Sequence, residues 1–201
     1  MQNKIETEIK LILGNCNLNE SEELISRIEK VMNLERTAMF HQTTHQFFED
    51  DYTKQTAFPR IRNEQNGDTT LTVKAKIKNE IGQEIESNYF KRVELETNIS
   101  NTENVIAMMP FFGFKNKISW EKKRINFLSE NNDTENYQLD FAVSLDETPM
   151  GYFLEIESSE DKIEEVIKLL GLSNLERSNK PYLALWEDYK KVNKVGGEMR
   201  F

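Results

Sequence analysis

Alternation of apolar and polar residues predicts eight β-strands along the 201-residue chain. In the opening segment KIETEIKLIL, the residues Glu6, Glu8 and Lys10 alternate with isoleucine, threonine and leucine. Successive side chains of a strand point to opposite faces, so one face of this strand is charged while the other is mostly apolar. The predicted strands cover residues 3–13, 40–50, 57–65, 69–79, 87–99, 116–129, 136–146 and 151–159.

Four further segments have the spacing or the end signals of helices. They cover residues 17–34, 101–114, 159–172 and 181–192. In the first, Asn19 or Ser21 is expected to cap an acidic first turn. In the third, Ser159 is the expected N-cap, and Gly171 marks the C-terminal end.

Strands in this number with helices between them predict an α+β fold with antiparallel neighbours. The turn signal Asn66–Gly67 predicts a hairpin between the third and fourth strands. No repeat, low-complexity run or linker divides the chain, so residues 1–201 are expected to form a single domain.

Charge and composition limit the class of protein that the chain can belong to and the compartment in which it is expected. The net charge is -9 and the isoelectric point is about 5.0, which disfavours a general nucleic-acid binder because such proteins need a basic face. Cys16 is the only cysteine, so no internal disulfide is expected. The sequence shows neither a signal-peptide pattern nor an apolar stretch of membrane length. We therefore expect a cytoplasmic protein with no membrane partner, as a monomer or homodimer.

Seven of the eight predicted strands carry charged residues on one face. These residues are Glu6, Glu8, Lys10, Arg60, Arg62, Lys74, Lys76, Arg92, Glu94, Glu96, Lys122, Arg124, Asp140, Glu155 and Glu157. A solvated sheet face explains any single strand. It does not explain why acids lie beside acids and bases beside bases, since like charges two apart on a face repel. An eight-stranded antiparallel closed β-barrel with a charged interior and flanking helices explains both facts, and it can enclose one small ligand.

The residue types inside that barrel predict its chemistry. Paired carboxylates are hard oxygen ligands for Mg²⁺ or Mn²⁺, whereas rows of arginine and lysine match a chain of phosphates. We expect the metal to be held mainly by Glu6, Glu8, Glu155 and Glu157, with Asp140, Glu94 and Glu96 near enough to join or to hold a second ion. The phosphates are expected to contact Lys10, Arg60, Arg62, Lys74, Lys76, Arg92, Lys122 and Arg124.

The order of these residues resembles the pattern of the CYTH superfamily, also called triphosphate tunnel metalloenzymes. Glu6-x-Glu8-x-Lys10 resembles its ExExK signature, and Arg92-x-Glu94-x-Glu96 resembles its RxExE strand. The other matches follow in order: Arg60 and Arg62, Lys74, Lys122 and Arg124, Asp140, and Glu155 with Glu157. Near the C-terminus Lys180-Pro181-Tyr182 resembles the family's Lys-Ser-Tyr element, with proline in place of serine.

The resemblance implies an eight-stranded tunnel that binds a small-molecule triphosphate with divalent cations. Its members hydrolyse tripolyphosphate, thiamine triphosphate or nucleoside triphosphates, and class IV adenylyl cyclases convert ATP to cyclic AMP and pyrophosphate. A metal-dependent triphosphatase is therefore the first hypothesis, an adenylyl cyclase the second, and a non-catalytic polyphosphate-binding module the third. The expected catalytic residues are Glu8, Lys10, Glu94 and Glu96, and the resemblance adds Lys180 to the substrate-binding set.

Two smaller expectations concern individual residues. Trp120 is expected to pack in the core or on the outside of the barrel rather than to serve as a platform on which a base stacks. The basic residues are expected to repel one another in the empty barrel, so that Arg124→Ala should cost the unliganded fold little or even stabilise it.

Overall fold

The computed structural model describes residues 4–15, 18–51, 54–79, 82–85, 87–129 and 141–201. Its strands are β1 (Lys4–Gly14), β2 (Leu34–Arg36), β3 (Phe40–Phe48), β4 (Ala57–Glu64), β5 (Thr69–Lys76), β6 (Phe90–Asn98), β7 (Asn116–Ser129), β8 (Phe141–Thr148), β9 (Gly151–Ser158) and β10 (Arg177–Ser178). Its helices are α1 (Leu18–Met32), α2 (Thr102–Met108), the 3₁₀ turn η1 (Met109–Phe112), α3 (Glu160–Leu169) and α4 (Tyr182–Asn193).

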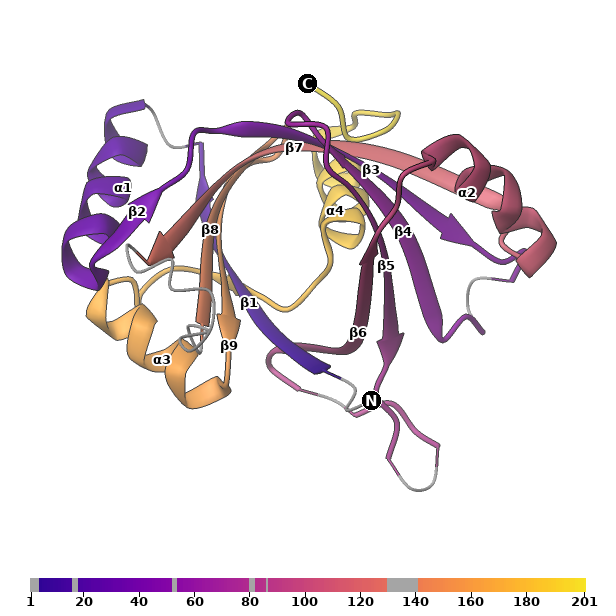
Figure 1. The fold of residues 1–201 in the computed structure, drawn as a ribbon. Coiled ribbons are helices and arrows are strands. Elements are labelled where there is room, and N and C mark those ends of the chain that lie inside the picture. Colours follow the sequence, from indigo (N-terminus) through magenta and orange to yellow (C-terminus); the bar gives the residue numbers. More distant parts are fainter. Residues whose placement is uncertain (1–3, 16–17, 52–53, 80–81, 86, 130–140) are drawn as a thin grey trace.

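Eight of these strands form a closed antiparallel barrel in the order β1-β6-β5-β4-β3-β7-β8-β9, and a pairing of β9 with β1 completes the ring (Figure 1). The predicted α+β barrel with flanking helices is confirmed. The hairpin expected at Asn66–Gly67 is also present, because β4 pairs with β5 across that turn. The two short strands β2 and β10 were not predicted, and they pair outside the ring with β7 and β1.

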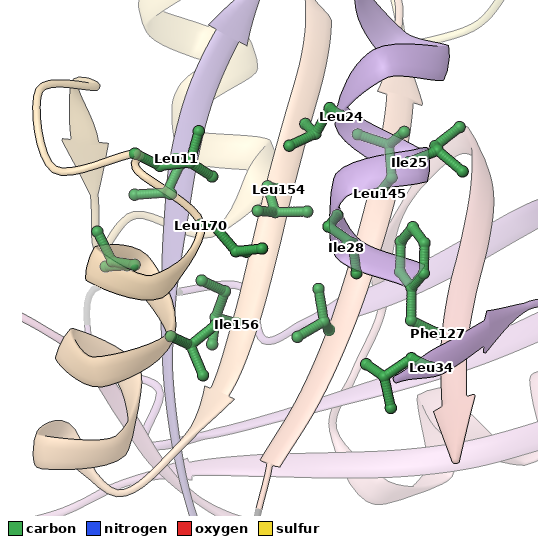
Figure 2. Packing of buried hydrophobic residues seen from close by; sticks show 14 of the residues in the cluster. Leu11, Leu24, Ile25, Ile28, Leu34, Phe127, Leu145, Leu154, Ile156 and Leu170 are labelled. Carbon is green, nitrogen blue, oxygen red and sulfur yellow. The ribbon is translucent and has the colours of Figure 1, made fainter. Parts of the chain in front are cut away.

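The outer face of one half of the barrel forms the main hydrophobic core. Leu11 on β1 and Leu154 and Ile156 on β9 are fully buried there. Helices α1 and α3 cover this face, where Ile28 of α1 and Leu170, directly after α3, join the core (Figure 2). Burial of each such side chain contributes roughly 1.5–3 kcal/mol. Because the apolar residues of these strands face the helices outside the barrel, the charged residues that alternate with them must face inward.

Helix α4 is seen within the ring of strands, where it closes part of the barrel (Figure 1). Its residues Tyr182 and Trp186 pack against Trp120 of β7 and Phe153 of β9, both on inward-facing positions. The C-terminal segment 197–201 holds helix α4 in place. Met199 is fully buried in the same cluster, and its carbonyl accepts a hydrogen bond from the Glu121 backbone N–H at 2.8 Å.

Helix boundaries differ slightly from the predicted ones. Helix α1 already begins at Leu18, so the expectation that Asn19 or Ser21 caps it is wrong. Ser159 does occupy the N-cap position of α3, in an extended conformation. Within the described part of the chain, no helix combines the length and apolar character that a membrane crossing requires.

Candidate functional site

The barrel encloses a cavity of about 990 Å³ lined by inward-facing charged residues. Those predicted for the site that line it are Glu6, Glu8, Lys10, Arg60, Arg62, Lys74, Arg92, Glu94, Glu96, Lys122, Arg124, Glu155 and Glu157. Strand pairing explains this convergence. Glu8 lies opposite Glu157, Lys10 opposite Glu155, and Lys74 opposite Glu94, and partners directly opposite in a sheet point to the same side.

Two of the predicted residues lie elsewhere, and a third is not among the residues that the structure describes. Asp140 is outside the described residues. Lys76 lies further along β5, where its ammonium pairs with Glu84 at 3.2 Å, and Lys180 is exposed and pairs with Asp188 of α4 at 2.7 Å. Neither lysine lines the cavity.

The charges divide the interior into two walls. The acid wall comprises the carboxylates of the adjacent strands β6, β1 and β9: Glu94, Glu96, Glu6, Glu8, Glu157 and Glu155. The basic wall comprises cations of β4 and β7, which flank β3: Arg60, Arg62, Lys122 and Arg124. This arrangement offers carboxylate oxygens on one side of the cavity and N–H donors on the other.

Lysines neutralise part of the acid wall. The Lys74 ammonium donates to Glu6, and the Lys10 ammonium donates to Glu8. Burial still raises the pKa of Glu6 and of Glu8, with Glu94 adding to the rise at Glu6 and Glu155 to that at Glu8. At Lys10 burial opposes the charge, but Glu8 and Glu155 outweigh it and raise the pKa. The Glu6 and Glu8 carboxylates are therefore short of positive charge.

Asp146 of β8 organises part of the basic wall, although the sequence analysis did not select it. Its carboxylate is fully buried and accepts two hydrogen bonds from Arg124, both at 2.7 Å, and one from Lys122 at 2.8 Å. The hydroxyl of Tyr182 donates a further hydrogen bond at 2.7 Å. The signal for Asp146 was present, since Ser144 and Asp146 alternate with apolar residues on the strand that precedes Glu155.

Arg124 is held by acids on two strands. Besides Asp146 it donates to Glu155 at 2.9 Å, and these two carboxylates outweigh burial and raise its pKa well above the usual value. Burial acts against the charge of Glu155 too, but Arg124, Lys10 and Lys122 lower its pKa well below the usual value.

Arg62 is the contrasting cation. Its guanidinium makes no hydrogen bond or ion pair with any described residue, and its Nε is buried without an acceptor. Burial, together with Arg60 and Arg124, lowers its pKa to about 10. The charged form of Lys122 is also disfavoured, because burial and the nearby Arg124 lower its pKa to about 7. The basic wall thus holds more positive charge than its neighbours compensate.

Trp120 packs in a hydrophobic cluster that also borders the cavity. It lies on the inward face of β7, two residues from Lys122, and lines the cavity while it packs 5.8 Å from the ring of Tyr182. The expectation that it packs in the core is confirmed, since Trp120 is buried in the cluster with Tyr182 and Trp186. Its position depends on α4, which the strand pattern alone does not locate.

Comparisons with solved structures agree with this architecture. A conserved hypothetical protein from Pyrococcus furiosus is 22% identical with a TM-score of 0.61, covering 90% of this chain and 99% of its own. A candidate adenylate cyclase from Vibrio parahaemolyticus is 19% identical with a TM-score of 0.62, covering 92% of this chain and 99% of its own.

A third similar structure comes from Hippeastrum. It is described as a candidate adenylyl cyclase with a dominant triphosphatase activity, and is 14% identical with a TM-score of 0.54, covering 92% of this chain and 95% of its own. No protein-family model and no curated protein sequence matches the chain. The chain therefore shares the closed-barrel fold of these solved structures.

Proposed function

We propose that this protein is a divalent-metal-dependent hydrolase of a triphosphate-bearing small molecule. One observation carries the proposal: Arg62 is a buried cation without an ion-pair partner among the described residues, and it faces a cavity whose opposite wall is acidic. An isolated buried charge is costly, so such a site is expected where an anionic ligand supplies the missing partner. The Hippeastrum protein, whose description includes triphosphatase activity, has the same fold.

The basic wall would hold the phosphate chain. Arg60 and Arg62 project from neighbouring inward positions of β4, and Arg124 faces the same space from β7. Guanidinium groups present parallel N–H donors that match phosphate oxygens. Because Asp146 and Glu155 fix Arg124, little side-chain entropy would be lost when it binds.

The acid wall has donors suited to Mg²⁺ or Mn²⁺. Among the described residues no group of three acids or histidines is already assembled around one point, since the Lys10 and Lys74 ammonium groups lie between the carboxylates. The donor chemistry nevertheless fits, because Glu8 and Glu157 face each other across β1 and β9 and are hard oxygen ligands. Glu6, Glu8 and Glu157 would hold the ion, with Glu155 and Glu94 adjacent. Bound there, it would neutralise phosphate charge as the bond breaks.

The residues of the chain would carry out the remaining steps. In hydrolysis, water attacks the terminal phosphorus, its proton passes to a carboxylate of the acid wall, and the bond to the bridging oxygen breaks. Glu94 and Glu96 of β6 are suitable acceptors. The basic wall would stabilise the charge that develops on the leaving diphosphate.

The direct test is to incubate purified protein with tripolyphosphate, thiamine triphosphate or ATP, each with Mg²⁺ or Mn²⁺. We expect phosphate release that stops when a chelator is added and falls at least a hundredfold in Glu6→Gln. Cyclic AMP from ATP would instead indicate a cyclase, and binding without turnover a non-catalytic module. Exposed Glu103→Gln on α2 is the matched control.

A further inference from the structure

The Lys74 ammonium lies among three carboxylates of the acid wall. It donates to both oxygens of Glu6 at 2.5 Å, and it lies 3.7 Å from Glu94 and 3.9 Å from Glu8. All four side chains are at least largely buried, so little water screens these ion pairs. Lys74 therefore supplies positive charge to the same carboxylates that are proposed to hold the metal ion.

Strand order places Lys74 at the boundary between the two walls. Strand β5 lies between β6, which carries Glu94, and β4, which carries Arg60. Arg60 also reaches the Glu94 carboxylate, at 3.3 Å, so acids and bases meet at this boundary. A lysine ends in a compact ammonium on a flexible four-carbon stem. The Lys74 ammonium can therefore turn from the carboxylates to a phosphate beside Arg60 while its strand stays in place.

Lys74 and a divalent cation cannot share the carboxylate of Glu6. Mg²⁺ binds carboxylate oxygens at about 2.1 Å, and both Glu6 oxygens already accept hydrogen bonds from Lys74. Two positive charges held by one buried carboxylate repel strongly. Lys74 must leave Glu6 when the ion binds there, and the phosphate chain offers the ammonium a new anionic partner.

Lys122 provides the natural comparison. Its ammonium is also buried and lines the cavity, but its hydrogen-bond partner is Asp146, at 2.8 Å, which does not line the cavity. Its contact with the acid wall is to Glu155, at 4.0 Å. Lys122 thus resembles Lys74 in charge and burial, but it does not occupy the oxygens of Glu6 and Glu8.

We infer that Lys74 competes with the divalent cation for Glu6 and Glu8, and that the displaced ammonium binds the phosphate chain. This inference rests on the proposed function, because it takes the metal and phosphate sites as given. Lys74 thereby couples the two binding events. Phosphate draws the ammonium away from the carboxylates and so favours the cation, and by linkage the cation favours phosphate by the same factor. The protein should bind free Mn²⁺ weakly and the metal–triphosphate complex more tightly.

The test measures the Kd of Mn²⁺ without phosphate, from the EPR signal of free Mn²⁺, in wild type, Lys74→Met and Lys122→Met. Methionine keeps an unbranched side chain and removes the charge. Lys74→Met removes the competitor, so the Kd should fall roughly tenfold or more. Lys122→Met removes an equal charge from the other wall and should change the Kd by less than about threefold, because it frees no oxygen of Glu6 or Glu8. Equal effects of the two substitutions would overturn the inference.

A second measurement needs no substitution and decides the question even if Lys74→Met misfolds. NMR of the lysine ammonium ¹⁵N nuclei in wild type reports the partner of Lys74 directly. Diamagnetic Mg²⁺, added until the amide signals of β1 stop changing, should shift the Lys74 signal as the ammonium leaves Glu6. The Lys122 signal should move less. A Lys74 signal that stays unchanged at this point would contradict the displacement.

The outcomes separate the two proposals. If Lys74→Met binds Mn²⁺ no better than wild type, the inference fails, whereas metal-dependent phosphate release would keep the proposed function. Binding of Mn²⁺ that is measurable only in Lys74→Met would support the inference. If neither protein binds Mn²⁺ and no triphosphate is hydrolysed, both proposals fail.

Discussion

At the scale of single residues, the two arginines Arg62 and Arg124 differ most clearly. Both are buried and face the same cavity, but Arg124 contacts two carboxylates while Arg62 contacts none of the described acids. The sequence could identify both as cations of one interior. It could not distinguish them, because the difference depends on Asp146, whose contact with Arg124 follows from the pairing of β7 with β8.

The difference in ion pairing predicts that replacing Arg124 destabilises the unliganded fold, whereas replacing Arg62 does not. The ion pairs of Arg124 argue against the small cost that the sequence predicts for Arg124→Ala, since this change leaves Asp146 and Glu155 buried with less compensation. We expect it to lower the free energy of unfolding by roughly 3–5 kcal/mol. Arg62→Ala should change it by less than about 1 kcal/mol, or raise it, because an unpaired charge is removed. Urea denaturation of both variants tests this, and equal losses would contradict it.

A second prediction at this scale concerns pH. His45 donates to or accepts from Ser119 Oγ at 2.8 Å, and burial, with Lys117 and Arg200, lowers its pKa below the usual 6.5. The folded protein therefore resists protonation of His45 more than the unfolded chain does. This group's contribution is complete above the unfolded pKa and is lost as pH falls through the folded pKa.

The measurement is the loss of unfolding free energy between about pH 7.5 and 5.5, compared in wild type and His45→Gln. The loss should be smaller in the variant, while other titrating groups cancel in the comparison. An identical loss in both proteins would exclude a contribution from His45.

At the scale of elements, the predicted strands were found because alternation lasts for eight or more residues in each. The missed strands β2 and β10 have three and two residues, too few for alternation to show. Residues 101–114 carried helical signals, but Pro110 ends α2 early and leaves a 3₁₀ turn whose Phe111 is exposed. The position of α4 inside the ring could not be predicted, because it depends on contacts with β7 and β9.

The contacts that hold α4 in place lead to a prediction for this helix. Met199 fills the cluster behind Tyr182 and Trp186, so Met199→Ala should leave a cavity and cost roughly 2–5 kcal/mol. Amide hydrogens of α4 should then exchange faster, whereas those of α1 should be less affected. Hydrogen exchange by mass spectrometry reports both helices in one experiment. Uniform acceleration across the two would show that α4 does not loosen separately.

At the scale of the whole molecule, the interior keeps acids and bases on separate walls, and Arg62 has no ion-pair partner among the described residues. Tripolyphosphate with Mg²⁺ or Mn²⁺ should therefore stabilise the fold, by about 2.7 kcal/mol at a ligand concentration one hundred times Kd. Thermal unfolding with and without ligand measures the shift. It should shrink in Arg62→Ala and at high salt, because phosphate contacts are partly screened. No shift with either metal would contradict the phosphate site.

Closure of the barrel also determines when the first strand can pair with its last neighbour during synthesis. Glu8 pairs with Glu157, which the ribosome adds 149 positions later. At roughly 5–20 residues per second, the first strand waits about 7 to 30 seconds for its neighbour. Until then β1 lacks its partner β9, and the carboxylates of β1 are exposed to water. The acid wall is assembled only after Glu157 has been added, so a chain that terminates before that residue cannot form the site.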